Sequence, residues 1–101
     1  MDRRLSLHQI LVNILGSNNV YFQPPETIKL QYPCIIYSRN DIDQRYADNK
    51  SYIARVRYSI TLITRTPDSE LVKAILELPY CSYDRYYAAD SLSHDTFVLY
   101  Y

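Results

Sequence analysis

The sequence YIARVRYSITLITR at residues 52–65 decides the fold of this chain. Its even-numbered positions are almost all apolar, whereas its odd-numbered positions include Arg55, Arg57 and Arg65. A period of two residues predicts a β-strand with one apolar face and one largely polar face. At about 3.3 Å per residue the stretch would span roughly 46 Å, whereas a domain of this size has a radius of gyration of about 13 Å. We therefore expect the strand to bend strongly or to project from the body of the domain.

The residues before this strand predict its hairpin partner. Residues 31–38 read as a strand, and Pro33, which cannot donate a ladder hydrogen bond, marks an edge or the first residues of that strand. Residues 39–50 carry three positive and three negative charges. A polar segment of about a dozen residues is typical of a functional or mobile loop. The sequence therefore predicts a long antiparallel hairpin whose tip is a polar loop at residues 40–50.

The N-terminal segment predicts a helix over residues 2–15, because its apolar side chains recur at helical spacing. Asp2 or Ser6 can cap the start of this helix. Gly16 stands where the left-handed residue after a helix is expected.

A second helix is expected after the long strand. Thr66 can cap it, Pro67 suits the first helical position, and acidic residues follow in the first turn. An apolar stripe continues to Leu78, and Pro79 ends the helix.

Three shorter strands complete the expected architecture. Residues 20–22 predict a short strand, and residues 81–87 and 96–101 predict two more, separated by a polar turn at residues 90–94. The expected element order is α-(β)-β-β-α-β-β. It predicts an α+β fold, in which a small single domain over residues 1–101 has a mainly antiparallel sheet, a long β-hairpin and two helices packed on the sheet.

Composition excludes several classes of site. The chain of 101 residues has one glycine, which excludes the glycine-dependent loops of Walker, dinucleotide-binding and EF-hand sites, and we expect no cofactor. Acidic and basic residues number 11 each, which excludes a general basic surface for nucleic acid. No export signal and no run of 18 apolar residues is visible, so we expect a soluble protein made in a cytoplasm.

The two cysteines, Cys34 and Cys81, lie far apart in the sequence and form no C-x-x-C pair. We expect two buried thiols in a reducing compartment. A disulfide between them is the less favoured alternative.

Neither histidine belongs to a recognisable catalytic group. His8 falls within the first predicted helix, and His94 is next to Asp95 in an extended segment, where neighbouring side chains point to opposite faces. We therefore expect two surface or partly packed histidines, no catalytic residue and no enzymatic activity.

Asp41, Asp43 and Asp48 invite comparison with a metal site. An EF-hand loop needs an oxygen ligand at its fifth position and a glycine at its sixth, where this chain has Arg45 and Tyr46. We therefore expect a structural or interface loop here and no bound metal.

Tyrosine is the strongest compositional signal, because the chain has 12 tyrosines and no tryptophan. Half of them crowd the last 22 residues: Tyr80, Tyr83, Tyr86, Tyr87, Tyr100 and Tyr101. One domain of this size cannot bury all of these rings, and tyrosine is enriched at protein interfaces. We expect part of this aromatic surface to contact other protein.

Arg55 and Arg57 share the polar face of the long strand. Arginines interleaved with aromatic residues can bind nucleic acid on a sheet surface, but zero net charge favours ion pairs with a partner chain. The predicted protein-interface residues are Asp41, Asp43, Arg45, Tyr46, Asp48, Arg55, Arg57, Tyr83, Arg85, Tyr86 and Tyr87.

Four segments carry a resemblance to a known family: YPCIIY at 32–37, DIDQRYADN at 41–49, LPYCSYDRYY at 78–87 and FVLYY at 97–101. In overall pattern, residues 30–101 resemble the tail-terminator proteins of long-tailed bacteriophages, also called tail-completion or head–tail joining proteins. The resemblance includes no catalytic signature.

The resemblance implies a structural protein of the virion, assembled in the host cytoplasm and located at the head-proximal end of the tail. It implies a homo-oligomer, a six-fold ring that caps the tail tube, stops its polymerisation and docks to the head connector or a head-completion protein. It implies no membrane partner and no specific nucleic acid. The alternatives are a neighbouring head–tail connector (neck) protein, a small nucleic-acid-binding module using the arginines, and an enzyme without a recognisable motif.

Overall fold

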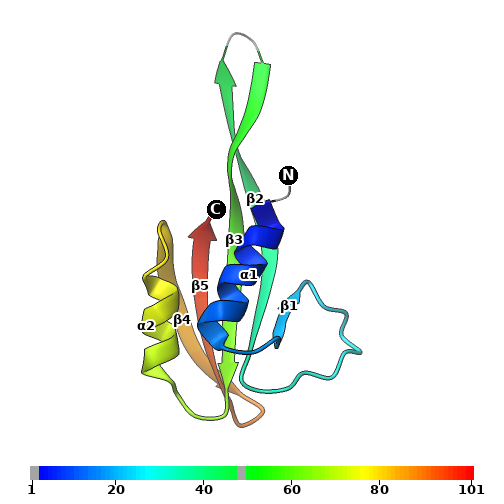
Figure 1. Ribbon diagram of the computed structural model, residues 1–101, viewed down its shortest axis with the longest axis vertical. Helices are drawn as coiled ribbons and strands as arrows, with labels where there is room; N and C mark the ends of the chain where they lie inside the picture. The colour runs from blue at the N-terminus through cyan, green and yellow to red at the C-terminus, as the bar shows by residue number, and fades with distance from the viewer. Residues whose placement is uncertain (1–2, 48–49) are drawn as a thin grey trace.

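The computed structural model describes residues 3–47 and 50–101, with side-chain environments described outside residues 41–54 and 69. In chain order the elements are α1 (Arg3–Leu15), β1 (Val20–Phe22), β2 (Cys34–Ala47), β3 (Lys50–Thr64), α2 (Ser69–Leu76), β4 (Cys81–Ala89) and β5 (Leu92–Tyr100). The two helices and the mostly antiparallel five-stranded sheet confirm the predicted α+β fold (Figure 1).

The strands form one sheet in the order β1-β2-β3-β5-β4. β1 runs parallel to β2, with Val20 opposite Ile35, and the other neighbouring pairs are antiparallel. Both helices lie over the same face of the sheet, α1 across β2 and β3 and α2 beside β4 (Figure 1). The opposite face of the sheet is not covered by either helix.

A single apolar core fills the space between the helices and the sheet. Leu7 and Leu11 from α1 and Ile75 from α2 enter it. On β3 the even-numbered side chains Tyr58, Ile60 and Leu62 are buried here, as the two-residue period predicts. The other buried members are Val20, Ile35, Tyr37, Phe97 and Leu99.

The hairpin of β2 and β3 differs from the predicted one in an informative way. β2 continues to Ala47, which pairs with Lys50, so the prediction of a polar loop over 40–50 is wrong for residues 40–47 and 50, which are strand. Asp41, Asp43 and Arg45 occupy every second position, which suits a strand as well as a polar loop. Irregularities in the β2–β3 register fall between Arg39 and Asp41 and between Asp43 and Gln44.

We call residues 41–47 of β2 and 50–55 of β3 the arm. The arm extends beyond the helices and the other strands, and the molecule measures 51 × 27 × 23 Å along its principal axes (Figure 1). The expectation that the long strand projects from the body is confirmed.

The start of α1 corrects one capping prediction. Ser6 lies inside the helix, and its Oγ is 2.9 Å from the hydroxyl oxygen of Tyr101, so it is not the cap. Asp2, the other candidate, lies outside the described residues. At the end of α1, Gly16 has φ +79° and its N–H donates to the carbonyl of Val12, which confirms the predicted left-handed residue.

The cap of α2 also differs from the prediction. Asp68, not Thr66, is the N-cap, because its carboxylate accepts hydrogen bonds from the N–H groups of Glu70 and Leu71. The helix therefore begins after Pro67 and ends at Leu76, before the expected limit at Pro79.

The last two strands are longer than predicted. They meet at a turn in which Asp90 and Ser91 both have positive φ, which is the backbone pattern of a tight hairpin. β5 therefore begins at Leu92, and His94 lies in a strand rather than in a turn.

Both cysteines are free thiols, Cys34 buried and Cys81 half-buried, so a disulfide is not formed. Burial raises the pKa of both, and that of Cys34 reaches about 11.

Among the described residues, neither helix is long and apolar enough to span a lipid bilayer.

Candidate protein interface

The arm contains the first group of predicted interface residues. Asp41 lies directly opposite Arg57 in the β2–β3 register, and Asp43 lies opposite Arg55. Opposite charges at such cross-strand positions attract one another within one chain. Any ion pair with a partner chain would therefore compete with these neighbours. Arg45 and Tyr46 lie further out in β2, and Asp48 lies outside the described residues.

Both outer edges of the arm are open among the described strands. β5 accompanies β3 only as far as Arg57, which pairs with Tyr100. On the other side, β1 pairs with β2 only between Ile35 and Tyr37. Unpaired strand edges present backbone donors and acceptors to another chain, and an isolated two-stranded ribbon is marginally stable in water.

The second group of predicted residues lies on β4, the last strand of the sheet, whose side chains are almost all exposed. A register irregularity between Tyr83 and Arg85 divides the group between the two faces. Tyr83 and Tyr86 lie on the face that carries the helices, whereas Arg85 and Tyr87 lie on the uncovered face. Sequence reasoning grouped these four residues, and the structure brings them together in two pairs.

On the helix-bearing face, Tyr83 and Tyr86 contact buried polar residues of β5. The Tyr83 hydroxyl donates a 2.7 Å hydrogen bond to Oδ1 of Asp95, and the Tyr86 hydroxyl is 3.2 Å from Oγ of Ser93. The hydrogen bond to Asp95 is the main cause that raises the pKa of Tyr83 to about 12. The Tyr83 ring also meets Phe97 edge to face at 5.5 Å.

On the uncovered face, Tyr87 stacks on His94, with ring centroids 4.6 Å apart and planes 14° from parallel. The guanidinium of Arg85 lies 5.3 Å from the centroid of the Tyr87 ring. These contacts give β4 a layer of aromatic and cationic side chains on the face that no helix covers.

The histidines occupy packed positions, as expected. The hydroxyl of Tyr37 is 2.7 Å from Nδ1 of His8, whose pKa is lowered by burial and by the nearby charge of Arg4. His94 and Asp95 point to opposite faces of β5, so they form no oriented pair. Among the side chains that the structure describes, which do not include residues 41–54, no three His, Cys, Asp or Glu group in a way that would hold a metal.

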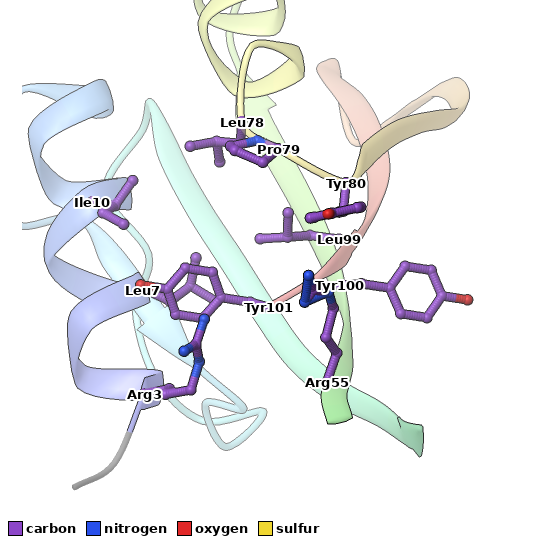
Figure 2. Close-up of a pocket in the computed structure, with 10 residues that line it drawn as sticks. All are labelled: Arg3, Leu7, Ile10, Arg55, Leu78, Pro79, Tyr80, Leu99, Tyr100 and Tyr101. Atoms are coloured by element: carbon purple, nitrogen blue, oxygen red, sulfur yellow. The ribbon is translucent and has the colours of Figure 1, made fainter. Parts of the chain in front are cut away.

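A pocket of about 280 Å³ lies where the start of α1 meets the end of β5 (Figure 2). The described residues that line it are Arg3, Leu7, Ile10, Arg55, Leu78, Pro79, Tyr80, Leu99, Tyr100 and Tyr101. Two guanidinium groups stand against tyrosine rings there: Arg3 at 4.7 Å from the Tyr101 centroid and Arg55 at 4.1 Å from that of Tyr80.

Sequence reasoning missed most of this pocket. Tyr80 belongs to the C-terminal tyrosine cluster, which is a sequence signal that could have included it among the interface residues, and the structure leaves it 65% exposed. Arg3 carries no comparable signal, because only the packing of α1 brings it to the C-terminal strand. Among the predicted interface residues whose side chains are described, Arg55 lines the pocket.

Comparison with protein-family models gives no match for this chain, and comparison with curated proteins gives no match either.

Proposed function

We propose that this protein is a structural protein of phage morphogenesis, a tail terminator that forms a ring at the head-proximal end of the tail tube. In that role it stops polymerisation of the tube and joins the tail to the head connector. The proposal rests on the sequence resemblance of residues 30–101 to tail-terminator proteins. One structural observation supports it most directly: the arm projects from the body with both edges open.

A closed ring needs two different surfaces on each subunit, because its contacts are heterologous. This chain offers the arm as one surface and the outer edge of β4 as another, and they lie on different parts of the molecule (Figure 1). In the proposed ring, the arm of each copy contacts the β4 edge of the next. Such a contact covers two open edges, which natural proteins rarely leave long and unprotected.

Charged residues set the register of the proposed contact. Arg55 and Arg57 from β3 pair with carboxylates of a neighbouring subunit, and Tyr46 supplies an apolar anchor near the end of the arm. Charge pairs at a partly desolvated interface contribute to specificity more than to affinity. Ordering side chains on assembly opposes binding, and in this proposal the six-fold ring forms on the tube.

Shortening the arm tests the proposal. Because Asp43 lies opposite Arg55, residues 44–54 can be replaced by Asn-Gly, a two-residue turn that joins directly paired residues. We expect a folded monomer, since the core residues all lie outside the deleted segment. In infected cells this variant should produce overlong tubes and tailless heads.

A matched control replaces Glu26 and Lys29, both exposed and distant in sequence from the arm, with alanine. Normal tails in the control and defective tails in the shortened variant support the proposal. Normal tails in both would show that the arm is not an assembly element. A particle reconstruction with one copy, or none, at the head-proximal end of the tail would contradict the ring itself.

Separate binding experiments distinguish the alternatives. A neck protein would remain bound to heads when the tube protein is absent, whereas a terminator would bind the purified tube. For a nucleic-acid-binding module, Arg55→Glu with Arg57→Glu would abolish binding to DNA near physiological salt. The proposal predicts no such binding by the unmodified protein.

A further inference from the structure

The pocket between α1 and the end of β5 has a shape suited to a small part of a larger ligand. Figure 2 shows Leu7 and Ile10 approaching it from the helix, and Leu78 and Pro79 approaching from the segment after α2. Its volume of about 280 Å³ lies just below the roughly 300–1,000 Å³ of small-molecule sites. It has room for one or two side chains rather than for a large cofactor.

The inner part of this pocket is apolar. Leu7 and Leu99 are buried members of the core, and Ile10, Leu78 and Pro79 line the sides. An apolar side chain that entered here would leave water and gain stability from its buried area. Charged groups or sugars without an apolar portion would gain nothing from these surfaces.

The outer part of the pocket is cationic. Arg3 and Arg55 each stand close to a tyrosine ring, and Tyr101 has its hydroxyl 2.9 Å from Ser6 Oγ. A guanidinium that packs against a ring keeps N–H groups free to donate to a carboxylate. None of the ten described residues that line the pocket is acidic, although Asp43 lies opposite Arg55 in the β2–β3 register and competes with a ligand carboxylate for that arginine.

This local charge contrasts with the chain as a whole, whose formal net charge is zero. Two cations beside an apolar floor complement a ligand that combines carboxylates with an apolar group. We infer that the pocket binds an acidic peptide segment of a partner protein. An aromatic or aliphatic side chain of the peptide fills the apolar floor, and flanking carboxylates pair with Arg3 and Arg55.

The inference does not depend on ring assembly. Arg3, Tyr80 and Tyr101 lie outside the arm, and the two proposals share only Arg55, which the shortened arm variant retains. A failed arm-shortening experiment would leave the pocket inference in place, and a failed peptide experiment would leave the ring proposal in place.

Three capped tripeptides test the inference by separating charge from apolar contact. The probes are acetyl-Asp-Phe-Asp-amide, acetyl-Asn-Phe-Asn-amide and acetyl-Asp-Gly-Asp-amide, titrated into the full chain while amide chemical shifts are followed by NMR. We expect the first probe to bind most tightly, with shifts centred on the pocket residues. The Asn probe loses the charge, the Gly probe loses the ring, and each should bind several-fold more weakly.

Variants of the protein test which arginines are used. Arg3→Gln and Arg55→Gln should each weaken binding of the Asp-Phe-Asp probe by about two- to fivefold, the usual size for exposed ion pairs. Arg65→Gln is the matched control, because Arg65 is exposed and follows the opposite end of β3. Its affinity for the probe should equal that of the unmodified protein.

Four outcomes would overturn the inference. These are equal binding of the Asp and Asn probes, equal binding of the Asp and Gly probes, equal weakening by Arg65→Gln, and the absence of shifts at pocket residues. Because both arginine side chains reach the surface of the pocket, the variants should fold normally. Their amide spectra verify this in the same experiment.

Discussion

The Tyr83 hydroxyl on the edge strand β4 donates a 2.7 Å hydrogen bond to Oδ1 of Asp95, a residue of β5 that is only 5% exposed. A carboxylate this buried loses hydration and needs a donor to replace it. The exposed strand therefore contributes a group that the interior requires. This hydrogen bond therefore makes the β4 edge, which we propose as an interface, contribute to the stability of the monomer.

Removal of that hydroxyl should destabilise the protein. Tyr83→Phe keeps the ring contact with Phe97 but removes the donor to Asp95. We expect a loss of about 1–3 kcal/mol in the free energy of unfolding, measured by urea denaturation. Tyr86→Phe is the matched control: it removes a 3.2 Å contact between two neutral hydroxyls and should cost about 0.5–1.5 kcal/mol. Equal losses in the two variants would contradict the special role of Asp95.

The same hydrogen bond predicts a late tyrosine titration. The pKa of Tyr83 is raised to about 12 from the ordinary value of 10.0, mainly by its hydrogen bond to Asp95. Because the folded protein holds this proton more tightly, the stabilisation is complete below pH 10 and is lost as the pH rises to about 12. Ultraviolet titration should show a late tyrosinate component that is absent in Tyr83→Phe and present in Tyr86→Phe. Its persistence in Tyr83→Phe would assign it to another tyrosine.

The two thiols should differ in their reactivity. Cys34 is buried, with its pKa raised to about 11, whereas Cys81 is half-buried with a raised pKa. Since the thiolate is the reactive form, a thiol-specific reagent near neutral pH should modify Cys81 first and Cys34 only as the chain opens. Cys81→Ser should remove the faster phase and Cys34→Ser the slower one. A faster phase that survives in Cys81→Ser would contradict the assignment.

Two leucines of α1 provide a paired test of the core. Leu11 is fully buried between the helix and the sheet, whereas Leu5 is 61% exposed. Leu11→Ala should cost about 2–5 kcal/mol of stability, because it removes buried apolar contacts and leaves a cavity. Leu5→Ala should change the stability by less than about 0.5 kcal/mol. Thermal or urea unfolding measures the stability of both variants. Similar losses of stability would contradict the assignment of Leu11 to the core.

The sequence determined the architecture wherever burial imposes a period on it. Alternation through Tyr58, Ile60 and Leu62 predicts both the strand and its buried face, because each second side chain must leave water. Helical spacing through Leu7 and Leu11, followed by Gly16, similarly predicts the first helix and its end. The excess of tyrosine predicted exposed rings on β4, since a small core cannot contain them all.

Tertiary structure alone decided the features that have no such period. Residues 41–47 combine three charged residues with Gln44, so their composition resembles that of a polar loop, and only their pairing with β3 makes them a strand. Asp95 is buried on β5, and its carboxylate accepts a hydrogen bond there from the hydroxyl of Tyr83 on the neighbouring strand. The pocket unites Arg3 and Tyr101 from opposite ends of the chain, and only the packing of α1 beside the end of β5 brings these side chains together.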